Sequence, residues 1–182
     1  MPFPRNWVEE LIVEWLHLEG HMVEANFPVA TTSVGGRGEV EAVGARVNEG
    51  FLEIIHIETG QLSGGKSSVE SIEKKFRQEI HESLIKYFRD IFASESDNVS
   101  YRKIYKASYW TQPTMDGIRS FGIEVIPLPD FLRDFVIPTI KQWKENPPHA
   151  PKARGPMIAL PESHWLLKLL EYMHTQNLLM DS

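Results

Sequence analysis

The stretch that decides the fold reads GGRGEVEAVG over residues 35–44 and LEIIHIETG over residues 52–60. Both segments have a pattern typical of β-strands, and Asn48-Glu49-Gly50 between them predicts a turn. Side chains on a strand point alternately to the two faces of a sheet. Each strand therefore has a face that is apolar at one end and carries ionisable side chains at the other. The pair predicts a hairpin in which the two ionisable ends meet.

Three ionisable side chains define this end of the hairpin. Glu41 lies on the first strand, and His56 and Glu58 share one face of the second strand with Ile54. An ionisable group at the edge of an apolar core costs desolvation energy unless it is paired or bound to a metal ion. Convergence of the three is typical of a metal-assisted hydrolase. The alternative is structural: two solvent-facing glutamates, and a histidine that bonds the backbone or pairs with Glu58.

The composition is that of one soluble globular domain. The chain has 182 residues, of which 42% are hydrophobic and 24% charged, enough for a substantial core. There is no apolar run of membrane-spanning length and no signal-peptide pattern, so we expect a cytoplasmic protein without a membrane partner. The absence of cysteine excludes disulfides, thiolate metal sites and cysteine nucleophiles. A net charge of −6 argues against broad nucleic-acid binding but is compatible with a local basic groove.

Hydrophobic periodicity predicts an α/β chain with the order α-β-β-β-α-β, then α-β-α and a C-terminal helix. Besides the hairpin, we expect strands at residues 21–30, 99–110 and 121–128, and helices at residues 6–19, 69–91, 113–120, 130–144 and 160–179. This order gives a mixed central sheet flanked by helices on both faces. Pro138 should kink the helix that contains it. Residues 1–145 are predicted to form the domain, and residues 146–182 a proline-rich connector and a C-terminal helix that packs on the domain or on a partner.

The order of elements and several short motifs resemble those of the PD-(D/E)XK nuclease superfamily, which has the restriction-endonuclease-like fold, and in particular its Holliday-junction-resolvase-like members. The resemblance covers about residues 5–130. It rests first on Glu9, which precedes Leu16 and Gly20 in the predicted first helix, and on Asn26 in the first strand. It rests also on Gly36 and Arg37, which precede the strand that carries the acidic residue Glu41. The E-x-K signature of the next strand is altered. His56 stands at its acidic position and Glu58 at its basic position.

The resemblance implies a metal-dependent endonuclease that hydrolyses nucleic-acid phosphodiesters with Mg²⁺ or Mn²⁺. The implied ligands are Glu41, Glu58 and His56, since carboxylates suit hard divalent cations and imidazole suits Mn²⁺. His56 is also a candidate base that orients the attacking water. Glu9 would close the site from the first helix through a water molecule. The alternative for Glu9 is a first-turn acid that complements the helix dipole.

Three further residues are predicted to bind the substrate or to replace the missing lysine. Arg37 is a candidate phosphate contact, unless it only shapes the turn, and Gln61 would contact a phosphate or the metal shell. Lys66 is the nearest lysine downstream of the altered signature. Lys74 and Lys75, in contrast, alternate with glutamates along the long helix, which predicts a solvated helix face.

The strand at residues 99–110 combines basic and aromatic side chains: Tyr101, Arg102, Lys103, Tyr105, Lys106, Tyr109 and Trp110. Such a mixture can bind single-stranded nucleic acid by charge and stacking. Aromatic residues on a strand more often belong to the core, which is the interpretation we favour.

Three functions are compatible with the sequence. The first is a nuclease with an altered site, which the clustering of Glu41, His56 and Glu58 favours. The second is the same fold without catalysis, acting as a nucleic-acid-binding or assembly module, which the acidic charge and the missing lysine favour. The third is an unrelated interaction protein whose proline-rich arm and Trp- and Leu-rich final helix pack on a partner, with a homodimer as one arrangement.

Overall fold

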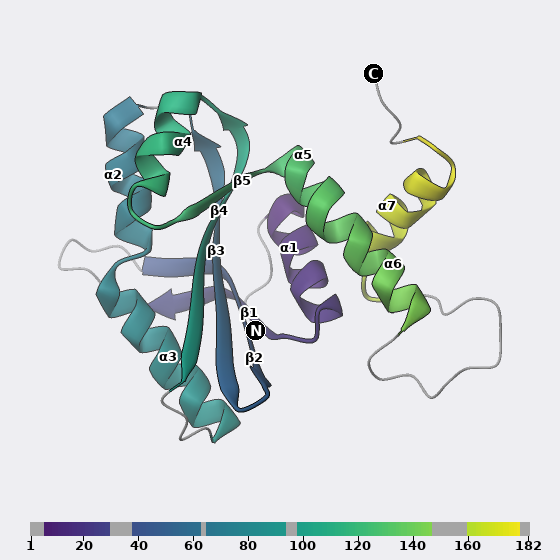
Figure 1. Ribbon diagram of the computed structural model, residues 1–182, viewed down its shortest axis with the longest axis horizontal. Coiled ribbons are helices and arrows are strands. Elements are labelled where there is room, and N and C mark those ends of the chain that lie inside the picture. The colour runs from purple at the N-terminus through teal and green to yellow at the C-terminus, as the bar shows by residue number, and fades with distance from the viewer. Residues whose placement is uncertain (1–5, 30–37, 63–64, 94–97, 147–159, 179–182) are drawn as a thin grey trace.

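A computed structural model describes residues 6–29, 38–62, 65–93, 98–146 and 160–178 (Figure 1). At its centre lies one five-stranded sheet with the strand order β1-β2-β3-β4-β5. The strands are β1 (Met22–Val29), β2 (Gly38–Asn48), β3 (Phe51–Leu62), β4 (Val99–Trp110) and β5 (Glu124–Pro127). The helices are α1 (Trp7–Leu18), α2 (Gly65–Lys75), α3 (Gln78–Phe92), α4 (Gln112–Arg119), α5 (Leu128–Phe131), α6 (Ile137–Glu145) and α7 (Trp165–Thr175), with a π-helical turn η1 (Leu132–Val136) between α5 and α6.

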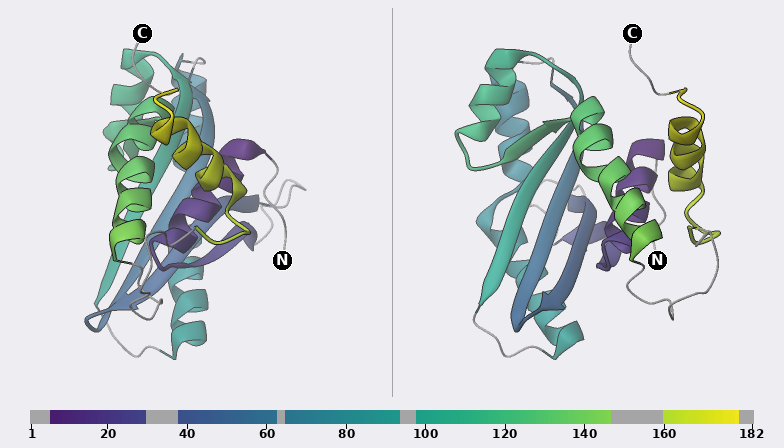
Figure 2. Two further views of the ribbon diagram at one scale, coloured as in Figure 1. Left: turned by 90° about the vertical axis from the view of Figure 1, so that its right-hand side faces the viewer. Right: turned by 45° about the vertical axis from the view of Figure 1, so that its right-hand side comes forward.

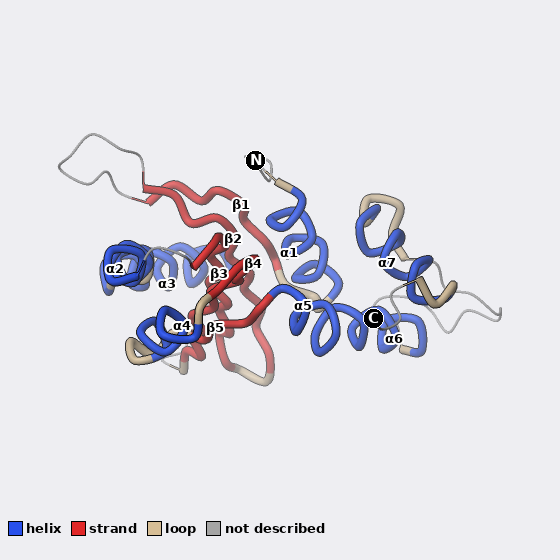
Figure 3. The backbone as a smooth tube through the Cα atoms, turned by 90° about the horizontal axis from the view of Figure 1, so that it is seen from above, coloured by secondary structure: helices blue, strands red, loops and turns tan. Residues whose placement is uncertain are grey.

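The sheet is mixed. Strands β1, β2 and β3 pair antiparallel, whereas β4 runs parallel to β3 and β5 runs parallel to β4. Figures 2 and 3 show α2, α3 and α4 on one face of the sheet and α1 with α5, α6 and α7 on the other. The prediction of an α/β chain with a mixed sheet flanked by helices is confirmed. Among the helices of the described residues, none has the length and apolar character that a bilayer crossing requires.

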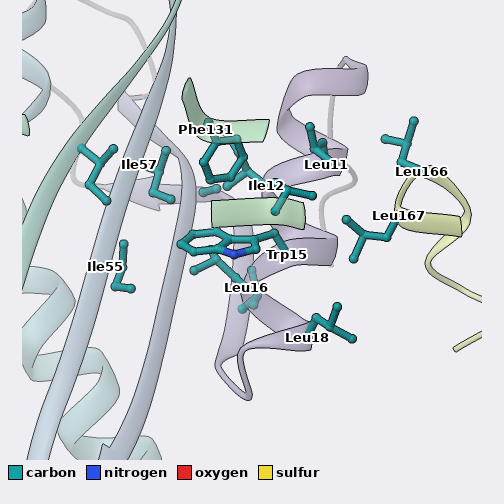
Figure 4. Packing of buried hydrophobic residues seen from close by; sticks show 14 of the residues in the cluster. Leu11, Ile12, Trp15, Leu16, Leu18, Ile55, Ile57, Phe131, Leu166 and Leu167 are labelled. Atoms are coloured by element: carbon teal, nitrogen blue, oxygen red, sulfur yellow. The ribbon is translucent and has the colours of Figure 1, made fainter. Parts of the chain in front are cut away.

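Helix α1 begins at a side-chain cap and packs on one face of the sheet. The Asn6 Oδ1 accepts hydrogen bonds from the backbone N–H groups of Val8 and Glu9 at 2.9 and 3.1 Å. The buried residues around α1 come from several elements (Figure 4): Leu11, Ile12, Trp15, Leu16, Leu18, Ile55, Ile57, Phe131, Leu166 and Leu167. Trp15 meets Phe131 edge-on, with ring centroids 5.0 Å apart. This contact joins α1 to α5 above the sheet.

The opposite face of the sheet is covered by α2, α3 and α4. Beneath α3, Leu84 and Phe88 pack on Val43, Leu52 and Ile54 of the hairpin strands. A second cluster fills the space between α2, α4 and the strands: Leu62, Ile72, Phe76, Tyr105, Ala107, Met115, Ile118, Ile123 and Val125. This is also the face that carries the ionisable residues of the hairpin.

The single helix expected over residues 69–91 is in fact two helices, α2 and α3. Arg77 between them has an extended backbone, with φ −62° and ψ 158°. Phe76, just before this break, turns inward, and its ring centroid lies 4.5 Å from that of His56. The apolar pattern continues through the break, which is why the periodicity does not reveal it.

The kink predicted at Pro138 takes the form of the π-helical turn η1. The N–H of Ile137 donates to the carbonyl of Leu132, five residues earlier. Pro138 has no N–H to donate to the carbonyl of Asp134, and its ring crowds that carbonyl. Widening the helix by one residue ahead of the proline removes this conflict.

Helix α7 packs on α1 and α6. Glu14 of α1 is buried, and its carboxylate accepts hydrogen bonds from the backbone N–H groups of Leu166 and Leu167 at 3.2 and 2.9 Å. The Trp165 Nε1 donates to Glu10 at 2.6 Å. A carboxylate from α1 thus satisfies N–H groups in the first turn of α7 that have no partner within their own helix. Most of the connector predicted at residues 146–156 lies outside the described residues.

Candidate functional site

Glu41 and Glu58 face each other across strands β2 and β3. The pair Ala42 and Ile57 is the neighbouring step of the antiparallel ladder. Residues opposite each other in such a ladder point to the same face of the sheet. The backbone N–H of Glu41 donates to Glu58 Oε1 at 3.3 Å. The hairpin therefore brings the two carboxylates together, on the face covered by α2 and α3.

A lysine from α2 joins these carboxylates. The Lys75 Nζ lies 2.6 Å from Glu41 Oε1 and 2.6 Å from Glu58 Oε2. The Glu58 side chain is fully buried, whereas the side chains of Glu41 and Lys75 are 21% and 38% exposed. The cluster is therefore closed on the Glu58 side and reaches solvent on the Lys75 side. We call Glu41, Glu58 and Lys75 the carboxylate–lysine cluster.

The position of Lys75 corrects two sequence interpretations. Lys75 is not on a solvated helix face, because it lies at the end of α2 and turns toward the sheet. Lys66, expected to replace the missing lysine, is exposed in the first turn of α2. The two lysines are nine positions apart in the sequence, which corresponds to about 13.5 Å along a helix axis. A signal for Lys75 was present, since Ile72, Lys75 and Phe76 have the spacing of one helix face.

Glu41 is held from two sides. Its Oε2 accepts hydrogen bonds from the backbone N–H and the hydroxyl of Thr59 at 2.6 and 2.7 Å. Its Oε1 accepts from Lys75. Thr59, which the sequence analysis did not single out, thus fixes the carboxylate of the neighbouring strand.

His56 serves Glu58 and does not form a third ligand in this arrangement. Its Nε2 lies 3.1 Å from Glu58 Oε1 and its Nδ1 lies 2.8 Å from the hydroxyl of Tyr101. The ring is fully buried, so both nitrogens are engaged inside the protein. Within the part of the chain that the structure describes, no group of three or more Asp, Glu and His side chains has the geometry to hold a metal ion. Both nitrogens of His56 are thus engaged by Glu58 and Tyr101, and the two carboxylates are the members of the predicted ligand set that share Lys75.

The electrostatics of the cluster separate the two carboxylates. Burial raises the pKa of Glu41, the neighbouring Glu58 charge adds to the rise, and Lys75 and Thr59 offset it only in part. Burial would also raise the pKa of Glu58, but the hydrogen bonds that His56 and Lys75 donate and the charge of Lys75 outweigh it and hold that pKa below its usual range. Burial opposes the charge of Lys75, yet the two carboxylates raise its pKa. As the pH falls, Glu41 is therefore the member of the pair that takes up a proton first.

The other predicted site residues lie elsewhere. Glu9 accepts a hydrogen bond from Asn6 at 2.6 Å at the start of α1, and α1 packs on the opposite face of the sheet. Gln61 is exposed near the end of β3. Arg37 lies outside the described residues.

The basic residues of β4 do not form one surface. Arg102 pairs with Glu124 on β5 at 2.9 Å. Lys106 is buried, with its Nζ 3.2 Å from the ring centroid of Phe131. Lys103 points to the other face, where it lines a cavity beside the α2–α3 break. Alternation along the strand therefore separates these charges, in agreement with the preference for a core strand.

Gly60 of β3 has a backbone conformation and surroundings that favour glycine. It lies two residues after Glu58 and has φ of 153°, a conformation that side chains rarely adopt. A Cβ atom at this position would lie 2.4 Å from the hydroxyl of Tyr105. The space beside Glu58 is therefore closed to a side chain from residue 60.

Comparison of the chain with models of known protein families gave no match, and comparison with curated proteins gave no significant match either. The geometry of the carboxylate–lysine cluster is therefore the evidence on function.

Proposed function

We propose that the chain is a metal-dependent nuclease in which Glu41, Glu58 and Lys75 form the catalytic cluster. One observation carries this proposal: a single ammonium group lies 2.6 Å from carboxylates on two adjacent strands. Two acids and one lysine are the residues that the resemblance to PD-(D/E)XK nucleases implies. Burial of Glu58 beside the partly exposed Glu41 and Lys75 gives the cluster one open side for a substrate.

In this proposal, the E-x-K signature of β3 lies two residues further along the strand than the resemblance first placed it. Glu58, which faces Glu41, takes the acidic position in place of His56. Gly60 then takes the position of the strand lysine, and Lys75 supplies the ammonium group from α2. The contact that a side chain at residue 60 would make with the Tyr105 hydroxyl supports this assignment.

The donor set fits a hard divalent cation. Glu41 Oε1 and Glu58 Oε2 already share one cationic group, and Mg²⁺ is commonly held by one or two carboxylates with several waters. These two oxygens would hold Mg²⁺ or Mn²⁺. When bound, such a cation activates a water molecule and stabilises charge on the scissile phosphate.

The chain's own residues have distinct tasks in this proposal. Thr59 keeps the Glu41 carboxylate directed at the cluster through two hydrogen bonds. Glu58 stays ionised because His56 and Lys75 donate to it. Lys75 is the exposed cation of the cluster, and its ammonium group can donate to a phosphate oxygen as negative charge develops there.

The alternative is a nucleic-acid-binding or assembly module that has lost catalysis. One observation favours it: Lys75, Thr59 and His56 already donate hydrogen bonds to both carboxylates without any metal ion. Such a satisfied polar network can be purely structural.

The two functions are separated by cation binding and cleavage measured together. Mn²⁺ binding is measured by calorimetry, and cleavage of linear, branched and single-stranded DNA and RNA is measured with Mg²⁺ and Mn²⁺ at low salt. The variants are Glu41→Gln, Lys75→Gln and the matched control Lys74→Gln, which changes the neighbouring exposed lysine.

The nuclease proposal expects Glu41→Gln and Lys75→Gln to abolish cleavage and Lys74→Gln to retain it. Glu41→Gln should also weaken Mn²⁺ binding, whereas Lys75→Gln should not, because it removes a competing cation. Absence of both cleavage and Mn²⁺ binding in the unmodified protein would leave only the alternative.

A further inference from the structure

A series of hydrogen-bonded side chains begins at Glu58, with Glu58 and His56 fully buried and Tyr101 partly buried. Glu58 and His56 come from β3, and Tyr101 comes from β4, where it pairs with Ile54 in the parallel ladder. The Glu58 Oε1 lies 3.1 Å from His56 Nε2, and His56 Nδ1 lies 2.8 Å from the Tyr101 hydroxyl. The sheet register therefore places three polar groups in series behind the carboxylate–lysine cluster.

The ionised state of Glu58 sets which groups in this series donate and which accept hydrogen bonds. Glu58 is an acceptor only when ionised, so the His56 Nε2 must carry the hydrogen that it shares with Glu58 Oε1. In the neutral imidazole, Nδ1 is then an acceptor and the Tyr101 O–H is its donor. One tautomer satisfies every group.

Packing holds both rings of the series in place. The Phe76 ring centroid lies 4.5 Å from that of His56, and the His81 ring centroid lies 4.1 Å from that of Tyr101. Phe76 lies at the α2–α3 break and His81 on α3, so the two helices cover the series. Because the Glu58 side chain is fully buried, protein groups and not bulk water set the orientation of its carboxylate.

We propose that Tyr101, acting through His56, is a positioning residue that keeps the Glu58 carboxylate directed at the cation-binding position between Glu41 and Glu58. This inference rests on the proposed nuclease function. Tyr101 selects the His56 tautomer, and His56 holds Glu58 Oε1. The other oxygen, Oε2, is thereby presented to Lys75 or to a divalent cation. Neither Tyr101 nor His56 contacts the substrate.

The test begins with the metal-free protein, so that it does not depend on catalysis. Two-bond ¹H–¹⁵N spectra of the imidazole groups are recorded, and the His56 signals are assigned by their loss in His56→Ala. We expect the Nε2–H tautomer alone. Tyr101→Phe should broaden the signals or mix the tautomers. Tyr87→Phe is the matched control, because it removes the hydroxyl of another tyrosine, which bonds Glu24 and does not contact His56.

Calorimetry then measures how the same variants change the affinity for Mn²⁺ at the cation-binding position. Outer groups that orient a metal ligand typically change affinity by about 10–100-fold when removed, which is the weakening expected for His56→Ala. Tyr101→Phe should weaken binding less, and Tyr87→Phe should have no effect. His56→Gln should restore part of the loss, because its amide N–H can donate to Glu58.

The outcomes separate this proposal from the proposed function. If Tyr101→Phe changes the His56 spectrum while the unmodified protein binds no Mn²⁺, the positioning of Glu58 stands and the nuclease proposal fails. If Tyr101→Phe changes neither the spectrum nor the Mn²⁺ affinity, or if Tyr87→Phe changes them equally, the positioning role is overturned. A loss of stability alone, with unchanged tautomer and affinity, also overturns it.

Discussion

Replacing Lys106 with Met is expected to stabilise the protein at pH 7. The Lys106 side chain lies on β4 with only 1% of the residue exposed, and its Nζ has no hydrogen-bond partner in the described part of the chain. Its surroundings are aromatic, with Nζ 3.2 Å from the ring centroid of Phe131 and 5.9 Å from that of Phe135. Met has a similar length and no charge, so the substitution removes the ammonium group with little change in packing.

The size of this stabilisation follows from the free energy that it costs to remove the proton of Lys106 on folding. Burial lowers the pKa of Lys106 from 10.5 to about 6, against a small opposing effect of Asp130. At about 1.4 kcal/mol per pH unit, giving up this proton at pH 7 costs the folded state about 5 kcal/mol. Because the folded pKa lies below 7, Lys106 is mostly uncharged in the folded protein at pH 7, so a cation–π contact with Phe131 returns little of this free energy. We therefore expect Lys106→Met to raise the free energy of unfolding by up to about 5 kcal/mol.

The direction of the Lys106 pKa shift also predicts how the stability of the protein changes with pH. Because the folded pKa lies below the unfolded pKa, the unfolded chain binds more protons between pH 6 and 10.5, and stability rises with pH across this window. Urea unfolding at several pH values between 7 and 10 measures the slope in the unmodified protein and in Lys106→Met, which should lack this contribution. Lys103→Met, a partly exposed lysine of the same strand, is the control. A Lys106→Met variant that is less stable at pH 7, or that keeps the full slope, would refute the reasoning.

Three further outcomes are expected. Glu14→Ala should destabilise the protein by about 1 kcal/mol, because the N–H groups of Leu166 and Leu167 lose their acceptor; an unchanged Tm would contradict this. Gly60→Ala should cost about 1–3 kcal/mol through its backbone conformation and the approach of the Tyr105 hydroxyl. Combining it with Tyr105→Phe should recover part of that loss in a urea-unfolding cycle, and strict additivity would argue against the contact. EDTA should abolish cleavage but leave the Tm unchanged, since Lys75, Thr59 and His56 already bond the two carboxylates without metal; a fall in Tm on chelation would show that a bound ion supports the fold.

Strand alternation predicted the shared face of the carboxylates from sequence, but their cation was missed. The period of two places Glu41 and Glu58 on known faces, and the antiparallel hairpin then sets them opposite each other. Lys75 depends on where α2 ends, and that break falls inside a continuous apolar pattern. The nearest lysine in the sequence, Lys66, was a poor guide because α2 carries it away from the sheet.

The group behind Glu58 was not predictable for a different reason. Tyr101 reaches His56 only in one register of β3 and β4. Two parallel strands are joined by a crossover, and no short turn sets their relative register. The packing of α7 on α1 was predicted only as one of two options, because nothing in the helix itself shows that the buried Glu14 would cap it.

Because Lys75 comes from α2 and not from the sheet, the carboxylate–lysine cluster is coupled to local unfolding of α2. A lysine on β3 would be held by the ladder of the sheet, whereas Lys75 reaches the carboxylates only while the end of α2 is docked. Any cation that binds between Glu41 and Glu58 therefore competes with the docking of α2. By thermodynamic reciprocity, docking weakens cation binding by the same free energy by which the cation loosens the helix. Amide hydrogen exchange in α2 would then report occupancy of the carboxylates, without any contact between that backbone and the ion.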